Sequence, residues 1–219
     1  MKIISFSLWG DNTRYTQGAI RNAELAKDIY PGWICRYYIS DCVPIDIIDK
    51  LVSFENVELI NMGVGDWTGM FWRFRPAGEE SVEVMLSRDV DSRLTVREKM
   101  AVDEWLNSDK GFHIMRDNVQ HNTAIMGGMW GAKKGAIDDM NYLIDKYIKG
   151  NFWQADQNFL REMIYPLVKQ DSCVHDEFFE NKPFPARRDE KHFVGQAYAG
   201  DDKILDAPEY FFDYLREQK

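Results

Sequence analysis

The stretch KIISFSLWGDNTRYTQGAIRNAELAKDIYPGWICRYYI, residues 2–39, decides the fold. Its opening residues, 2–8, are apolar and β-favouring, which predicts a buried strand. After a polar turn, residues 15–29 have the pattern of a helix that ends before Pro31. Residues 33–39 predict a second strand. The order strand, helix, strand favours two parallel neighbouring strands joined by a covering helix.

The same alternation continues along the chain. Residues 44–52 predict a helix opened by Pro44, and residues 57–60 predict a third strand. We therefore expect an α/β fold with a Rossmann-like, mostly parallel central sheet flanked by helices, in a single domain over residues 1–219. Ligands of such sheets bind at the carboxyl ends of the strands, so the chemistry should lie in the loops there.

The second half of the chain predicts further elements of both kinds. A helix is expected to begin with a capping box of Thr95 and Glu98. Residues 172–176 have the pattern of a strand end after the last predicted helix, and the rest of the chain after Ser172, which carries three prolines, is predicted to be irregular. The expected strands are 82–87, 112–115 and 123–130, and the expected helices are 95–106, 137–147 and 156–168.

Composition excludes some partners. The chain of 219 residues has 27 Lys and Arg against 36 Asp and Glu, a formal charge of −9, and no basic block that could neutralise a nucleic-acid backbone. Nucleic acid is therefore not an expected partner. An acidic protein that binds an anionic substrate needs a divalent cation or a local group of arginines to overcome its own field.

Cysteine usage and hydropathy indicate a compartment. The three cysteines cannot all pair, and none form a Cys-x-x-Cys motif, which favours a reducing environment. The apolar start at 2–8 is too short for a signal sequence, and no stretch approaches the roughly 20 apolar residues of a membrane span. We expect a cytoplasmic protein without a membrane span.

Asp89-Val90-Asp91 is the one Asp-x-Asp in the chain, and it follows a predicted strand. At a strand end both carboxylates can reach one hard cation, which keeps open positions for diphosphate oxygens. The motif alone is weak, and the alternative is a solvated acidic turn. Arg73, Arg88 and Arg93 lie near it in sequence; their guanidinium groups suit phosphate oxygens, or could simply neutralise the two acids.

Four segments carry a family resemblance through their order and spacing: Gly69–Phe74, Ser87–Arg93, Phe112–Asp117 and Gly127–Gly131. Together they resemble a GT-A-type glycosyltransferase family of bacteria and large viruses, chlorella viruses among them. The likeness extends from the first strand to about Gln196. It implies a nucleotide-sugar donor such as a UDP-sugar, a glycan or other hydroxyl acceptor, and a nucleotide-binding part over about 1–93 followed by a sugar and acceptor part over about 94–219.

The resemblance implies a metal site. In such enzymes the Asp-x-Asp carboxylates bind Mn²⁺ or Mg²⁺ through the donor diphosphate, which assigns this role to Asp89 and Asp91. Several related families supply a histidine from the C-terminal region as a further ligand. By that analogy His175 is the first candidate and His192 the second, although a histidine in such a position is often a hydrogen-bonded structural residue.

The resemblance also implies donor-binding residues at the first strand and in the glycine-rich segment. Trp9 and Tyr15 could stack on a uracil ring or pack over the sheet edge. Gly128 suggests close approach of the backbone to the donor sugar, with Trp130 either facing that sugar or lying in the core. The expected donor-binding residues are Ser7, Leu8, Trp9, Gly10, Tyr15, Arg73, Arg88, Gly128 and Trp130.

Two carboxylates compete for the catalytic position. Trp153-Gln154-Ala155-Asp156-Gln157 resembles a segment at a helix start in related transferases, and Asp117 is the rival of Asp156. An inverting transfer would need one of them as general base; a retaining one would use them to orient or stabilise the sugar. A nucleotidyltransferase is disfavoured, because the loop after the first strand is not glycine-rich and basic. A non-catalytic sugar-binding protein on the same fold would not need both aspartates.

Overall fold

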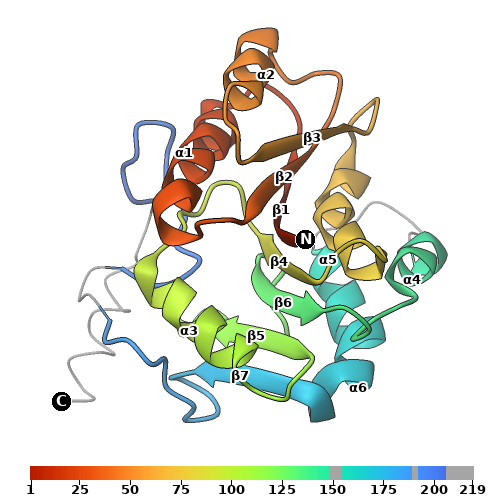
Figure 1. The fold of residues 1–219 in the computed structure, drawn as a ribbon, viewed down its shortest axis with the longest axis vertical. Coiled ribbons are helices and arrows are strands. Elements are labelled where there is room, and N and C mark those ends of the chain that lie inside the picture. The colour runs from red at the N-terminus through yellow and green to blue at the C-terminus, as the bar shows by residue number, and fades with distance from the viewer. Residues whose placement is uncertain (148–153, 189–191, 206–219) are drawn as a thin grey trace.

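A computed structural model describes residues 1–147, 154–188 and 192–205, and its framework is one seven-stranded sheet (Figure 1). The strand order is β3-β2-β1-β4-β6-β5-β7. Only β6 runs antiparallel to its neighbours, β4 and β5, so the sheet is mixed and mostly parallel. The strands are β1 Lys2–Leu8, β2 Ile34–Ile39, β3 Val57–Asn61, β4 Val84–Arg88, β5 Phe112–Arg116, β6 Met129–Lys133 and β7 Ser172–Asp176.

Helices cover both faces of this sheet (Figure 1). One apolar cluster joins the first strands to α1, α2 and α3, through residues such as Ala19, Leu51 and Val102. A second cluster lies on the other face, where Phe71 and Phe159 pack together. The helical elements are α1 Thr13–Ile29, α2 Ile45–Val52, η1 Trp67–Gly78, α3 Val96–Leu106, α4 Met140–Tyr147, α5 Ala155–Phe159, η2 Leu160–Ile164, α6 Tyr165–Val168 and η3 Lys169–Asp171.

The predicted alternation of residues 2–60 is confirmed. β1, β2 and β3 pair in parallel, and α1 and α2 follow the expected ranges closely. α1 begins earlier than predicted, at Thr13, because the Asn12 side chain accepts a hydrogen bond from the Arg14 backbone N–H and caps the helix. α3 begins after Thr95, whose hydroxyl accepts from the Glu98 N–H; the Glu98 carboxylate binds Arg88 instead of completing the capping box.

Two expectations for the rest of the chain were wrong in detail, and one element was not predicted. The strand expected at 123–130 is β6 at Met129–Lys133, because the glycines that precede it form a turn. The 3₁₀ helix η1 was not predicted, whereas β7 forms over the residues that have the pattern of a strand end, 172–176. The helix expected over 156–168 is divided by the π-turn η2, just before Pro166, whose nitrogen carries no hydrogen to donate.

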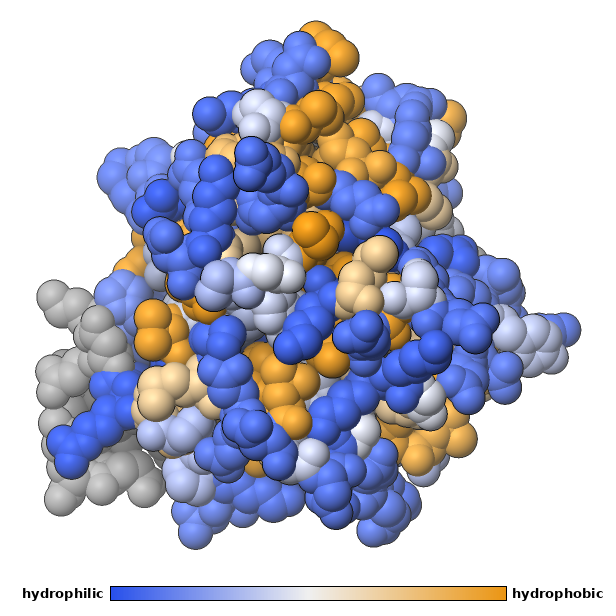
Figure 2. Space-filling view, in the orientation of Figure 1, coloured by the Kyte–Doolittle hydropathy of each residue, from blue (hydrophilic) through white to orange (hydrophobic). Residues whose placement is uncertain are grey.

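The face in Figure 2 is mostly hydrophilic, with apolar residues scattered in small groups between charged ones. Scattered apolar residues are normal on the surface of a folded protein. In the part of the chain that the structure describes, no helix is long and apolar enough to cross a membrane.

Candidate functional site

Asp89 and Asp91 follow β4 directly, at the carboxyl end of the parallel strands. The loop after β1, which begins at Trp9, lies at the same edge because β1 and β4 are parallel neighbours. The Asp89 side chain is 42% exposed and that of Asp91 is 14% exposed. Both carboxylates therefore lie at the sheet edge where ligands of α/β proteins bind, with Asp89 the more open to solvent.

Arg73 joins this pair to Asp156. Its guanidinium, on η1, donates one hydrogen bond to Asp89 Oδ1 and another, of 3.0 Å, to Asp156 Oδ2. Its Nε is buried without a hydrogen-bond partner. The structure thus brings together three residues that the sequence separates widely, two carboxylates and the arginine between them.

Arg14 binds the second aspartate. It lies in the first turn of α1, and its Nε donates to Asp91 Oδ2 over 2.7 Å, with a second ion-pair contact from the same guanidinium. Sequence reasoning did not select Arg14. Its position in the sequence indicated the site, since a basic residue just after the first strand of a parallel sheet lies at the carboxyl ends of the strands, where ligands bind.

Glycines allow this packing. A Cβ on Gly128 would lie 2.6 Å from the Asp89 backbone nitrogen, and one on Gly127 would lie 2.6 Å from the Arg73 guanidinium. The close approach of backbone predicted at Gly128 is therefore present, and its partner in the protein is Asp89. Contact between Gly128 and a donor sugar stays a prediction.

Burial makes two carboxylates of the site, those of Asp91 and Asp156, weaker acids by raising their pKa values. The pKa of Asp156 is raised, chiefly by burial, with Arg73 acting in the opposite direction. The pKa of Asp91 is raised by burial and by the neighbouring charge of Asp89, while Arg14 lowers it. Two crowded carboxylates favour a bound cation, because a positive charge offsets both the burial and their mutual repulsion.

The residues predicted to hold the nucleotide are found at the end of β1, in the loop after it and in the first turn of α1. The Ser7 hydroxyl accepts a hydrogen bond from the Arg73 backbone N–H, and Leu8 is buried in the core. Trp9 is partly buried and its ring meets Trp72 edge to face. Gly10 has φ +77°, and its N–H donates to Cys42 Sγ. Tyr15 is half-buried in α1, with the Arg14 guanidinium 5.4 Å from its ring centre.

Arg88 is not available to a diphosphate. Its side chain is 2% exposed, and its Nε donates to Glu98 Oε1 over 2.6 Å. The same guanidinium donates to the backbone carbonyls of Ser87 and Trp130. The prediction that Arg88 binds the donor is corrected: successive residues of a strand point to opposite faces, and this one points into the core under α3.

Trp130 is also a core residue. It is fully buried on β6, and its ring stacks on Phe112 at 5.2 Å and lies 5.4 Å from the ring of Phe74. A face enclosed in this way cannot pack against a sugar, so the alternative of a core tryptophan is correct.

His175 lies far from Asp89 and Asp91. It is buried on β7, the edge strand, with β5 and β6 between it and β4. Its Nδ1 is 2.8 Å from His113 Nε2, and its Nε2 is 3.5 Å from Glu104. The structure does not bring this predicted metal ligand to the acidic pair. His192, the second candidate, is partly buried just before Val194, and Trp153 lies outside the described residues.

Asp117 is enclosed by protein donors. Its carboxylate accepts hydrogen bonds from the guanidinium groups of Arg97 and Arg188 and, over 2.9 Å, from the Val194 backbone N–H. The side chain is fully buried. Asp117 therefore anchors the segment around Val194 to the end of β5, and its oxygens are engaged by the protein.

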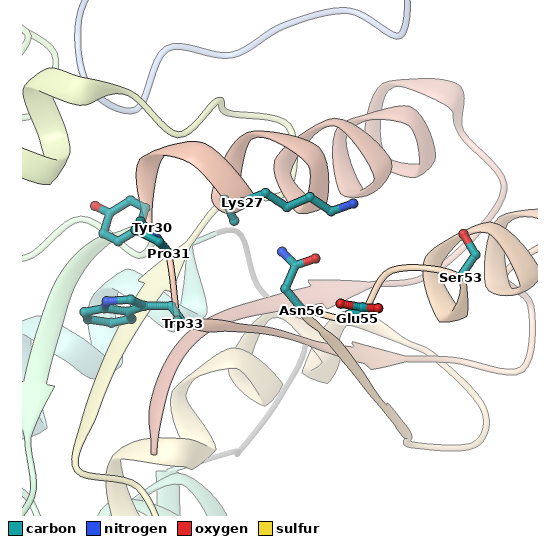
Figure 3. A pocket seen from close by; sticks show the side chains of 9 residues that line it. Lys27, Tyr30, Pro31, Trp33, Ser53, Glu55 and Asn56 are labelled. Carbon is teal, nitrogen blue, oxygen red and sulfur yellow. The ribbon is translucent and has the colours of Figure 1, made fainter.

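The cavity in Figure 3 lies at the amino ends of the strands, opposite the acidic site. Trp33 and Asn56 line it, just before β2 and β3 begin, with Lys27 and Tyr30 from the end of α1. The carboxyl ends of the same strands lie on the side of the sheet where Asp89 and Asp91 are found. This cavity is therefore separate from the acidic site.

Comparison with known proteins gives likenesses in structure only; no family model and no curated protein matches the sequence. A glycosyltransferase involved in glycosylation of the major capsid of PBCV-1 matches with a TM-score of 0.55 and 17% identity, over 80% of this chain and 81% of that one. The galactosyltransferase LgtC, solved with donor and acceptor sugar analogues, matches with a TM-score of 0.53 and 12% identity, over 81% and 74%.

One similar structure is named as a synthase and not as a glycosyltransferase. The 4-diphosphocytidyl-2C-methyl-D-erythritol synthase of Anaerococcus prevotii matches with a TM-score of 0.53 and 12% identity, over 98% of this chain and 96% of that one. Identities this low establish the fold and leave the activity to be argued from the site. The described chain has the α/β fold of the GT-A glycosyltransferases.

Proposed function

We propose that this protein transfers a sugar from a nucleoside-diphosphate sugar, a UDP-sugar first of all, to a hydroxyl of a glycan or other acceptor, and that it requires Mn²⁺ or Mg²⁺. The observation that carries the proposal is the grouping of Asp89, Asp91, Arg73 and Asp156 at the carboxyl edge of the sheet. The nucleotide part would lie in about 1–93 and the acceptor part in about 94–219.

The donor atoms fit a hard divalent cation. Asp89 and Asp91 offer carboxylate oxygens, which Mg²⁺ and Mn²⁺ prefer. Among the described residues no group of three His, Cys, Asp or Glu side chains could hold a metal. Two protein carboxylates suffice if the remaining ligands are water and diphosphate oxygens, as is usual for Mg²⁺ in nucleotide sites. The bound cation would offset negative charge on the departing nucleoside diphosphate.

Arg73 and Asp156 would serve the sugar end of the donor. Arg73 fixes both Asp89 and Asp156, so the distance between the cation-binding and sugar-binding groups is set by one rigid guanidinium. Asp156 is the better of the two catalytic candidates, because Arg73 ties it to Asp89 and its side chain keeps some exposure, whereas that of Asp117 is fully buried and engaged by two arginines and a backbone N–H. The raised pKa of Asp156 suits a group that exchanges a proton with an acceptor hydroxyl.

The likenesses to glycosyltransferases support this reading, and one observation favours a second candidate. The 4-diphosphocytidyl-2C-methyl-D-erythritol synthase matches nearly the whole chain, at a TM-score equal to that of LgtC. Nucleotidyl transfer would use the same edge and the same carboxylates, with loss of pyrophosphate in place of a nucleoside diphosphate.

One assay separates the two functions. The protein is incubated with UDP-sugars and, separately, with nucleoside triphosphates, in Mn²⁺ or with chelator, and release of UDP and of pyrophosphate is measured. We expect metal-dependent UDP release that is lost in Asp91→Asn. Pyrophosphate release alone would establish the second candidate, and no turnover with any donor would refute both.

A further inference from the structure

Arg14 occupies a carboxylate that the proposed function assigns to the metal. Two of its guanidinium nitrogens contact one oxygen, Oδ2 of Asp91. That oxygen is one of the four that the proposed function assigns to the cation. A guanidinium and a divalent cation on the same carboxylate oxygen repel each other and compete for its lone pairs, so both cannot hold it at full strength.

We propose that Arg14 couples metal binding to diphosphate binding: the metal displaces its guanidinium from Asp91, and the released guanidinium then binds the donor diphosphate. The inference rests on the proposed function and adds a residue and a thermodynamic linkage to it. The carboxylate and the diphosphate offer Arg14 the same kind of charge-assisted, planar hydrogen bonding, so the exchange costs it little.

The surroundings of Arg14 allow this movement. Its side chain is 37% exposed, whereas that of Arg73 is 11% exposed and is held by two carboxylates. Arg73 is therefore fixed, and Arg14 is the arginine of the site that can change partner. The Tyr15 ring, 5.4 Å from the guanidinium centre, gives a surface over which the group can pivot.

The position of Arg14 in α1 suits an anion. The first turn of this helix contains no acidic residue, and the helix N-terminus adds a partial positive charge to that of the arginine. Once Asp91 is taken by a cation, an arginine in this turn lies beside the metal site with the helix N-terminus next to it. A diphosphate bound to that metal supplies the negative charge that the arginine has lost.

The test measures Mn²⁺ and UDP binding without any turnover. Free Mn²⁺ is followed by electron paramagnetic resonance with and without UDP, and UDP affinity by calorimetry in saturating Mn²⁺, for wild type, Arg14→Met and Arg14→Gln. The matched control is Arg21→Met, which removes the same charge from the same helix. Arg21 pairs with Glu24 and lies near Asp202, whereas Arg14 pairs with Asp91. Circular dichroism confirms folding of each variant.

We expect both Arg14 variants to bind Mn²⁺ alone about tenfold more tightly than wild type, and UDP in Mn²⁺ about tenfold more weakly, within the usual range of coupling between sites. Arg21→Met should match wild type in both. Mn²⁺ affinity that is unchanged or lower in both Arg14 variants would overturn the coupling. If wild type binds no Mn²⁺ even with UDP, the proposed function fails as well, and the two failures are thus distinguished.

Discussion

Arg73 donates a hydrogen bond to Asp89 and another to Asp156, so one guanidinium holds together two carboxylates that come from different elements of the candidate site. Asp89 follows β4 and Asp156 lies in α5, and the chain between them includes two strands of the sheet, β5 and β6. The site is therefore a unit whose parts cannot be removed independently.

Replacement of Arg73 should damage both folding and activity. In Arg73→Met the buried Asp156 loses its positive partner, and loss of one member of a buried ion pair costs about 3 kcal/mol. We expect that loss in urea unfolding and a fall of about 100-fold in sugar transfer. Arg75→Met is the control, because Arg75 is more exposed and binds Asn141 and Asp145 on α4. Equal transfer rates in the two variants would contradict this role.

Gly128→Ala should displace Asp89. The new Cβ would lie 2.6 Å from the Asp89 backbone nitrogen, which cannot move without shifting the end of β4. We expect weaker Mn²⁺ binding and a loss of metal-dependent turnover of at least about tenfold. Gly78→Ala is the control, since the nearest atom to its Cβ would be the Asn141 side-chain nitrogen at 3.1 Å, with backbone atoms no nearer than 3.4 Å. Undiminished Mn²⁺ affinity in Gly128→Ala would show that Asp89 is not a ligand.

Arg88 should matter for stability and not for the donor. Arg88→Met leaves the carboxylate of Glu98 buried without its positive partner, with only the Tyr30 hydroxyl still donating to it, which we expect to cost about 3–5 kcal/mol in urea unfolding. The double variant Arg88→Met, Glu98→Leu removes both charges and should recover part of that loss, the remainder being the cost of leaving the buried Tyr30 hydroxyl without its acceptor. UDP affinity of the folded double variant should equal that of wild type. A donor-binding role for Arg88 would instead appear as weaker UDP binding in the double variant.

Acid should destabilise the protein through His121. Burial, with the nearby charge of Arg188, lowers the pKa of His121 to about 3 from the ordinary value of 6.5. Between these values the unfolded chain binds a proton that the folded chain does not, so stability falls as pH falls from about 6.5 towards 3. At pH 5 the loss from this group is about 2 kcal/mol relative to pH 7.

Urea unfolding at pH 7 and pH 5 measures this effect. Comparison of wild type with His121→Gln isolates the histidine, because the buried carboxyls of Asp91, Asp117 and Asp156, whose pKa values are raised, act in the opposite direction in both proteins. The variant should lose about 2 kcal/mol less than wild type on acidification. An identical pH dependence in the two proteins would show that His121 is not the group responsible.

The sequence by itself determined the parallel half of the fold and the acidic pair. Strand and helix periods over residues 2–60 are local signals, because they arise from which face of each element is apolar. The same local reasoning placed Asp89 and Asp91 at the end of a strand, and β4 does end there. It also expected close backbone approach at Gly128, where a Cβ would strike Asp89.

Only the tertiary structure decided which side chains meet. Arg88 lies beside Asp89 in sequence but points into the core, whereas Arg14 and Arg73 lie far away and hold the two aspartates. His175 is separated from them by two intervening strands, because β7 takes the edge of the sheet beyond β5. Strand order and side-chain direction depend on long-range packing, which no local pattern records, so the sequence could name the acids of this site but not their partners.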